Sequence, residues 1–190
     1  MPQPLHRHFT KLTALLGIVP NRASHVERLI CALGGFLGIL VVIWITRYFV
    51  PSGGVALVVA SMGASAVLLF VVPASPFSQP WPLLAGHLIP GAIGVTCGML
   101  IPDSMLASAI TVSATILVMQ YLRCIHPPGG ATALTAVIGG PDIHALGYQF
   151  LLTPVGINVV IMLGMAILVN YWFPWRRYPA GLKSHPVTLK

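Results

Sequence analysis

The chain has 190 residues, of which 56% are hydrophobic and only 7% are charged, and its mean hydropathy is +0.89. A soluble globular domain usually carries about 25% charged residues, because its surface must be solvated. This composition therefore excludes a water-soluble fold and predicts an integral membrane protein whose main partner is the lipid bilayer. The apolar stretches are long and continuous rather than alternating, which excludes a transmembrane β-barrel and predicts an all-α polytopic helical bundle.

The net charge of +7 does not indicate a nucleic-acid partner, because most of the basic residues gather near the two chain ends. Those near the ends are Arg7, Lys11, Arg22, Arg28, Arg176, Arg177, Lys183 and Lys190. Short basic flanks are typical of cytoplasmic ends, and they also attract anionic lipid headgroups. We therefore expect both termini to be cytoplasmic, an even number of crossings, and a bacterial inner (plasma) membrane location.

Three regions follow from this pattern: a basic cytoplasmic or interfacial segment (1–28), a transmembrane domain (29–175) and a basic cytoplasmic tail (176–190). The apolar run within the first region is short for a signal peptide and has no typical cleavage site. Dividing the charge-free stretches at proline and glycine gives six membrane segments, 29–50, 54–72, 83–101, 104–122, 129–138 and 148–173. The fifth is short, so it is either a re-entrant half-helix or part of a span whose remainder is unwound.

A faint repeat relates the second and fifth segments. Each is preceded by proline and glycine (51–54 and 127–130), and 63–67 (GASAV) resembles 130–134 (GATAL). Three segments followed by three that begin on the opposite side would form an inverted repeat, an arrangement that places a transport site at Gly/Pro-interrupted helices. Chance similarity between two Gly/Ala-rich helices explains the same pattern, since the two matches have different offsets.

Titratable residues are scarce in the apolar segments. The three acidic residues, Glu27, Asp103 and Asp142, all lie at segment ends, whereas cation pumps and proton-coupled carriers normally place a carboxylate inside the bundle. This favours an anion or a neutral solute, and it leaves His87 and His126 as the candidate intramembrane titratable groups. A hydrogen-bonded packing role explains His87 equally well.

The cysteines, Cys31, Cys97 and Cys124, form no CxxC pair and are odd in number. Neither a disulfide framework nor a structural zinc site is expected, and small packing residues are the better interpretation. The sequence gives no reason to expect a metal or another cofactor.

The most unusual string runs from His126 to Leu134 (HPPGGATAL). Two prolines followed by two glycines end one helix and allow another to begin with its amide groups exposed, which would favour an anion. The missing side chains of Gly129 and Gly130 would let a small ligand reach the backbone. A simple helix kink with His126 capping a carbonyl is the alternative, but polar interruptions at membrane depth are costly unless they line a cavity.

This string resembles the signature of the HPP family of small integral membrane proteins. A second block, 63–70 with Pro73, Pro76, Gln79, Pro80 and 86–87, is similar to the family, as is 170–179. The resemblance covers about residues 28–179 and implies a multi-span presumed transporter. It also implies a link to nitrite, because cyanobacterial and plastid relatives are associated with nitrite transport.

The predicted function is transport of a small solute, most plausibly a small inorganic anion such as nitrite, by a protein that is not an enzyme and forms a homo-oligomer. The candidate substrate-binding residues are Gly63, Ser65, Gln79, His87, Arg123, His126, Pro127, Pro128, Gly129, Gly130 and Thr132. Two alternatives stay open. One is an intramembrane serine hydrolase using Ser65 with His87 or His126, and the other is a membrane structural subunit that transports nothing.

Overall fold

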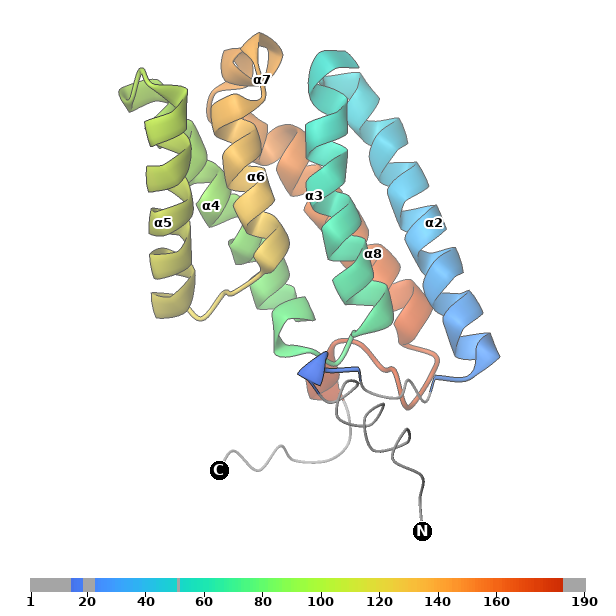
Figure 1. Cartoon of the computed structure of the whole chain (residues 1–190). Coiled ribbons are helices and arrows are strands. Elements are labelled where there is room, and N and C mark those ends of the chain that lie inside the picture. The colour runs from blue at the N-terminus through green and yellow to red at the C-terminus, as the bar shows by residue number, and fades with distance from the viewer. Residues whose placement is uncertain (1–14, 19–22, 51, 183–190) are drawn as a thin grey trace.

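The computed structural model describes residues 15–18, 23–50 and 52–182, and these residues form helices and no β-strand. Figure 1 shows the helices side by side in one bundle. In chain order the elements are α2 (His25–Phe49), α3 (Ser52–Val71), η1 (Pro76–Ser78), α4 (Pro80–Leu100), α5 (Ser104–Tyr121), α6 (Pro127–Ile138), α7 (Pro141–Leu146), η2 (Leu151–Gly156), α8 (Ile157–Asn170) and η3 (Ala180–Leu182). The all-α bundle expected from composition is confirmed.

Five segments are long and apolar enough to cross a membrane: α2, α3, α4, α5 and the continuous η2–α8 segment. The sixth, α6, has 12 residues, which makes it about 18 Å long, whereas the apolar core of a bilayer is about 30 Å thick. Figure 1 shows that α6 begins within the bundle, after a connection that rises from the end of α5, and runs to the opposite end, where α7 follows it. The fifth expected segment therefore does not dip in and return, and it is a short helix beside five that are long enough to cross.

Helix α4 begins at Pro80, three residues before the expected start. Pro80 and Pro82 occupy the first turn of α4. Proline is tolerated there, since the first amide groups of a helix have no intrahelical partner to lose.

The last segment is one continuous apolar helix in the prediction, but it is broken near its start in the structure. Its first turn, η2, is a π-helix with Thr153 in a non-helical conformation (φ −132°, ψ 114°), followed by Pro154. A proline within a helix removes one hydrogen bond and clashes with the preceding turn, which explains the break.

Glycines bring two helix pairs close together, as the small-residue spacing predicts. A Cβ placed on Gly34 of α2 would lie 2.6 Å from the ring of Phe70 on α3. One placed on Gly94 of α4 would overlap the carbonyl oxygen of Ala133 on α6. The backbones of α4 and α6 are therefore in direct contact.

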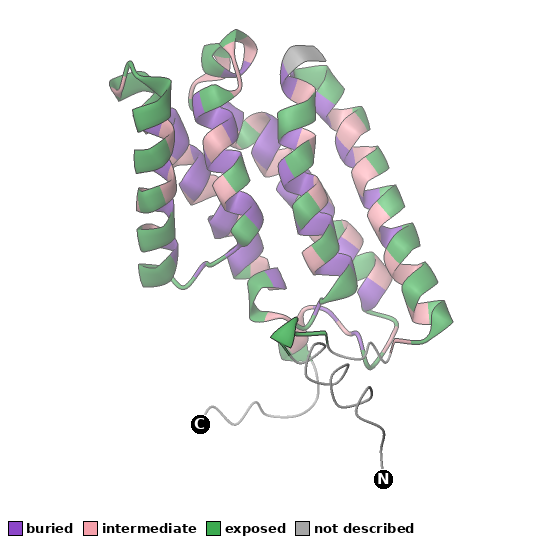
Figure 2. Ribbon diagram, viewed as in Figure 1, coloured by how far each residue is buried: buried purple, intermediate pink, exposed green. Residues whose placement is uncertain are grey.

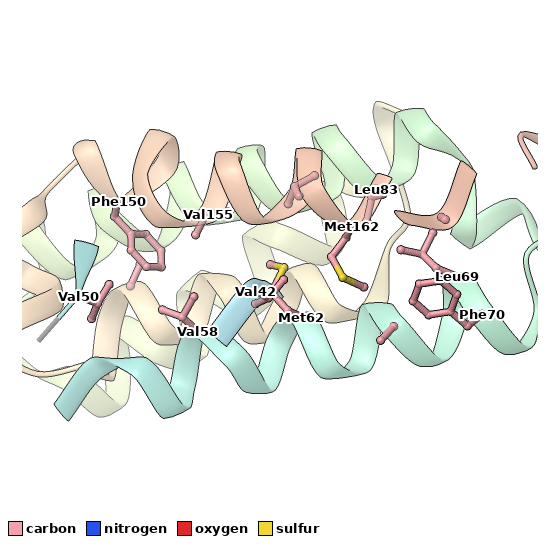
Figure 3. Close-up of a cluster of buried hydrophobic side chains, with 14 of the residues drawn as sticks. Val42, Val50, Val58, Met62, Leu69, Phe70, Leu83, Phe150, Val155 and Met162 are labelled. Carbon is pink, nitrogen blue, oxygen red and sulfur yellow. The ribbon is translucent and has the colours of Figure 1, made fainter. Parts of the chain in front are cut away.

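The buried apolar core runs along α3 and the η2–α8 segment (Figure 3). Its largest members are Tyr178, Phe70, Phe150, Met62, Leu69, Leu83, Ile143 and Met162. Figure 2 shows that exposed positions cover the outward faces of α2 and α5, while buried positions concentrate on α3, α4, α6 and α8. The exposed faces are apolar, as helices in contact with lipid require.

The helices run in an order that fits an inverted repeat. In Figure 1, α2 begins at the end of the bundle where α8 finishes, and α5 begins at the opposite end. The first three long helices and the last three segments therefore cross in opposite directions. The described chain also enters and leaves the bundle at one end, which agrees with an even number of crossings.

Candidate functional site

Three polar side chains from three helices meet in the interior of the bundle. Ser65 of α3, His87 of α4 and His126, which precedes α6, are all fully buried. The Oγ atom of Ser65 lies 2.8 Å from Nε2 of His87 and 2.9 Å from Nε2 of His126. The two imidazole centroids are 4.8 Å apart. One hydroxyl thus bridges two histidines, and we call these three residues the His–Ser–His cluster.

Two further contacts extend the cluster at its ends. Nδ1 of His87 lies 2.7 Å from the hydroxyl oxygen of Thr132 in α6, and Nδ1 of His126 lies 2.8 Å from the carbonyl oxygen of Phe77. A carbonyl oxygen only accepts, so Nδ1 of His126 carries the hydrogen and donates to Phe77. This fixes the tautomer of a neutral His126 and leaves its Nε2 atom as an acceptor for Ser65.

The Ser65 hydroxyl has two acceptors within reach, Nε2 of His126 at 2.9 Å and the carbonyl oxygen of Ser61 at 3.2 Å. When both imidazoles are neutral and the Ser65 hydrogen takes the shorter contact, to His126, the Ser65 oxygen accepts from Nε2 of His87. Nδ1 of His87 in turn accepts from the Thr132 hydroxyl. The result is one continuous chain of hydrogen bonds from Thr132 through both histidines to Phe77, in which each ring nitrogen has a partner.

Close packing of α4 against the start of α6 creates this geometry. A Cβ on Gly129 would overlap the carbonyl oxygen of Gly86, and one on Gly86 would lie 2.5 Å from Cβ of His126 and 2.8 Å from the carbonyl oxygen of Cys124. Only glycine lets the two backbones approach this closely. His87, next to Gly86, is thereby placed beside the first turn of α6.

The structure contradicts the expectation of exposed amide groups at the start of α6. Pro127 and Pro128 have no N–H, and the N–H of Gly129 donates to the carbonyl oxygen of His126 at 2.9 Å. The first turn therefore offers no array of free donors. Polar recognition at this place depends on side chains instead, namely the His–Ser–His cluster and Thr132.

The remaining candidate residues do not join the cluster. Arg123 is exposed and ends α5 in the left-handed conformation (φ 52°). Gln79 donates to the carbonyl oxygens of Pro73 and Ser75 and accepts from the N–H of Ala180, so its amide holds a loop and the C-terminal segment together.

The other candidate positions differ in exposure. Pro127 is exposed, Pro128 is buried, and Gly63 and Gly130 are partly buried. A Cβ on Gly63 or Gly130 would meet nothing within 4 Å, so these two glycines face open space.

Sequence analysis missed a second set of buried polar residues, which lies beyond the end of α8. Arg176, assigned to the basic tail, is buried, and its guanidinium donates to the carbonyl oxygen of Phe70 at 2.5 Å and to Oδ1 of Asn170 at 2.8 Å. It also lies 3.6 Å from Oε1 of Glu27. No local signal separates Arg176 from an ordinary basic flank, because its partners come from α2, α3 and α8.

A second polar contact at membrane depth joins Asn158 of α8 to Thr46 of α2. Nδ2 of Asn158 lies 2.8 Å from the Thr46 hydroxyl oxygen, and both residues are fully buried. Asn158 therefore bonds to α2, and Asn170 bonds to the Leu69 carbonyl oxygen of α3, as asparagine inside a membrane bundle often does.

Comparison with known proteins agrees with this membrane architecture. The sequence matches the transmembrane region of the HPP family over residues 20–179, which includes all six membrane segments and the His–Ser–His cluster. The chain belongs to the HPP transmembrane family. The HPP motif itself is His126-Pro127-Pro128, so the motif supplies one member of the cluster.

Two relatives of this HPP protein are transmembrane proteins of the slime mould Dictyostelium discoideum, 35% and 33% identical over 151 residues. The match covers 77% of this chain but only 53% and 48% of the relatives. The HPP protein thus spans about half the length of the curated relatives it matches. Their names describe them only as transmembrane proteins, and no solved structure matches the chain.

Proposed function

We propose that this HPP protein transports a small inorganic anion across a membrane, with nitrite as the first candidate. The observation that carries the proposal is the fully buried His–Ser–His cluster in a bundle whose acidic residues lie outside its interior. Glu27 lies in the first turn of α2, Asp103 caps α5, and Asp142 lies in the first turn of α7. Ionisable groups at membrane depth are costly and generally mark a solute pathway.

The chemistry of the cluster favours an anion over a metal cation. Hydroxyl groups and imidazole N–H groups donate hydrogen bonds, and a protonated imidazole adds a positive charge that offsets the charge of an anion. A hard cation would need several oxygen ligands and usually carboxylates, which this site does not offer. Nitrite is singled out by the resemblance to the family, and its size suits a site built from a few side chains.

The described conformation is closed around the cluster. Ser65, His87 and His126 are each fully buried. A hollow of about 910 Å³ lies between α2 and α3, but its lining, with residues such as Cys31, Phe36 and Phe70, includes no member of the cluster. An anion therefore reaches His87 and His126 only after the helices move, which is the behaviour of a carrier that alternates between two states.

Flux into proteoliposomes tests this function directly. Purified protein in vesicles should take up labelled nitrite faster than protein-free vesicles, and other small monovalent anions should compete. A variant with His126→Ala should lose most of the flux, because it removes one wall of the cluster, whereas His144→Ala should retain it. His144 is a matched control, since its ring hydrogen-bonds to the carbonyl oxygen of Val137 and is not part of the cluster. Equal flux from wild type and His126→Ala would refute this site.

A specific observation also favours the serine hydrolase as a second candidate. The Ser65 hydroxyl lies within hydrogen-bond distance of two imidazoles, which is the arrangement of a nucleophile with its base. However, Ser65 is in the middle of α3 and fully buried, so the neighbouring backbone amides are engaged in the helix and cannot form an oxyanion hole. We therefore propose that the protein is not an enzyme.

Covalent labelling separates the two candidates. A fluorophosphonate probe should leave the wild-type protein unlabelled in detergent and in vesicles. Labelling that disappears in Ser65→Ala would establish the hydrolase instead.

The cellular setting stays a prediction. A bacterial plasma membrane with both termini in the cytoplasm is consistent with the entry and exit of the described chain at one end of the bundle. Assembly into a homo-oligomer is likewise proposed, since one protomer of 190 residues offers few helices for a complete pathway.

A further inference from the structure

The polarity of the hydrogen-bond chain points beyond anion recognition. We propose that the His–Ser–His cluster is a proton relay, so that each anion crosses together with one proton. This inference rests on the proposed function, because it names the ion that is coupled to the anion. It stands on four hydrogen-bond contacts of 2.7–2.9 Å that join Thr132, His87, Ser65, His126 and Phe77 without a gap.

A proton shift along this chain requires no movement of heavy atoms. A small weak acid or a hydronium ion at the Thr132 end gives its proton to the Thr132 oxygen while the Thr132 hydroxyl hydrogen moves to Nδ1 of His87, and the conjugate anion or water is left behind. The N–H bond at Nε2 of His87 then breaks, and its hydrogen forms an O–H bond with the Ser65 oxygen. At the same time the original Ser65 O–H bond breaks, and that hydrogen moves to Nε2 of His126. One positive charge has passed from His87 to His126, and Ser65 ends with one hydrogen as it began.

The His126 end of the chain is close to the molecular surface. Its Nδ1–H is bonded to the carbonyl oxygen of Phe77, whose side chain is exposed in the loop between α3 and α4. That loop lies at the end of the bundle where α2 begins and α8 finishes (Figure 1). Release of the Nδ1 proton to water at this end completes the transfer and leaves His126 neutral with its hydrogen on Nε2. The hydrogens of the chain must then return to their first orientation before another proton enters.

The groups around the cluster leave the two histidines as the proton carriers. On the connection between α5 and α6 the titratable neighbour is Cys124, whose carbonyl oxygen lies close to Gly86. On the C-terminal segment it is Tyr178, whose hydroxyl donates to the carbonyl oxygen of Ser78 at 2.8 Å.

The nearest charged pair among the described residues, Arg176 and Glu27, contacts α3 at Phe70, more than one helical turn after Ser65. The hydrogen bonds of the two imidazoles go to Ser65, Thr132 and Phe77 instead. A proton on the cluster therefore has no carboxylate to hold it there, and the charge of the accompanying anion is the available compensation.

The test uses the full chain in proteoliposomes and measures two quantities for each variant. The first is exchange of labelled nitrite at equal pH on both sides, which needs anion passage only. The second is nitrite accumulation driven by a pH gradient, which a one-to-one coupling should raise about tenfold per pH unit. Protein-free vesicles correct for nitrous acid that crosses the lipid by itself. We expect the wild-type protein to show both activities.

Ser65→Ala removes the hydroxyl that joins the two imidazoles, and we expect the ratio of gradient-driven accumulation to exchange to fall at least tenfold. Ser65→Thr keeps a hydroxyl and should restore the ratio. Ser61→Ala is the matched control, because Ser61 lies one turn earlier in α3 and its hydroxyl donates to the carbonyl oxygen of Val58. Thr132→Val, which removes the entry hydroxyl with little change in shape, should lower the ratio as Ser65→Ala does.

The outcomes separate the relay from the function on which it rests. Wild-type protein that exchanges no small anion would overturn the proposed transport function. Exchange without gradient-driven accumulation would leave transport standing and overturn proton coupling. If Ser65→Ala does not fold, as judged by its size in detergent, the Thr132→Val variant is the test. A ratio of accumulation to exchange in Thr132→Val equal to that of wild type would then refute the relay.

Discussion

Replacing Arg176 by alanine removes a buried guanidinium that joins three helices. In the structure this group donates to the carbonyl oxygen of Phe70 and to Oδ1 of Asn170, and it lies 3.6 Å from the Glu27 carboxylate. Loss of a hydrogen-bond partner costs about 1–3 kcal/mol for each buried polar group left unpaired. Because the Phe70 carbonyl and the Asn170 side chain both lose this partner, the free energy of unfolding should fall by about 2–6 kcal/mol. Glu27 is partly exposed and should add little.

Equilibrium unfolding in mixed detergent micelles, followed by tryptophan fluorescence, measures this change. Arg177→Ala is the matched control, because the Arg177 guanidinium lies 5.4 Å from the ring centroid of Tyr171. Such a contact contributes about 0.5–1 kcal/mol at an exposed site. The unfolding free energy of Arg176→Lys should lie between those of the two alanine variants, since an ammonium group cannot reproduce the fork of donors in a guanidinium. Equal stability of the Arg176→Ala and Arg177→Ala variants would refute the argument that the buried guanidinium secures the end of the bundle.

Two further predictions concern packing and pH. Gly129→Ala should prevent recovery of folded protein, because its Cβ would overlap the carbonyl oxygen of Gly86, whereas Gly130→Ala should fold normally. Size-exclusion profiles in detergent compare the two variants. A normal profile for Gly129→Ala would contradict the close helix crossing. Burial raises the pKa of the Tyr178 phenol, so its neutral form is favoured in the folded state. The stabilisation is complete below the unfolded pKa of about 10 and is lost as the pH rises through the folded pKa. The unfolding free energy should therefore fall above about pH 10, and less so in Tyr178→Phe, as chemical unfolding across that range will show.

Much of the candidate site was predictable as a set of residues but not as an arrangement. His87 and His126 were chosen because titratable groups are rare in the apolar segments, and Ser65 and Thr132 because they lie in the two blocks that resemble the family. Arg123 was chosen because it stands beside the HPP string, and the structure places it on the surface. Scarcity identifies polar residues, but it does not tell which of them meet.

The hypothesis of exposed amide groups at the start of α6 is wrong, and part of the reason can be read in the sequence. Pro127 and Pro128 contribute no N–H, and only the observed bond from Gly129 to His126 shows that the next amide is occupied as well. The glycine at 129 is required by the carbonyl oxygen of Gly86 on another helix. The backbone of this motif therefore forms a contact between α4 and α6 and does not form a ligand site.

The sequence by itself determined that this is a membrane-embedded all-α protein with six segments, because hydropathy and helix breaking depend on neighbouring residues along the chain. Tertiary structure alone decided that α6 does not dip in and return, that Arg176 is buried, and that one serine bridges two histidines. Ser65 is separated from His87 by 22 residues and from His126 by 61. A hydrogen bond needs its two atoms within about 3 Å, and for residues so far apart that distance is set by how α3, α4 and α6 pack.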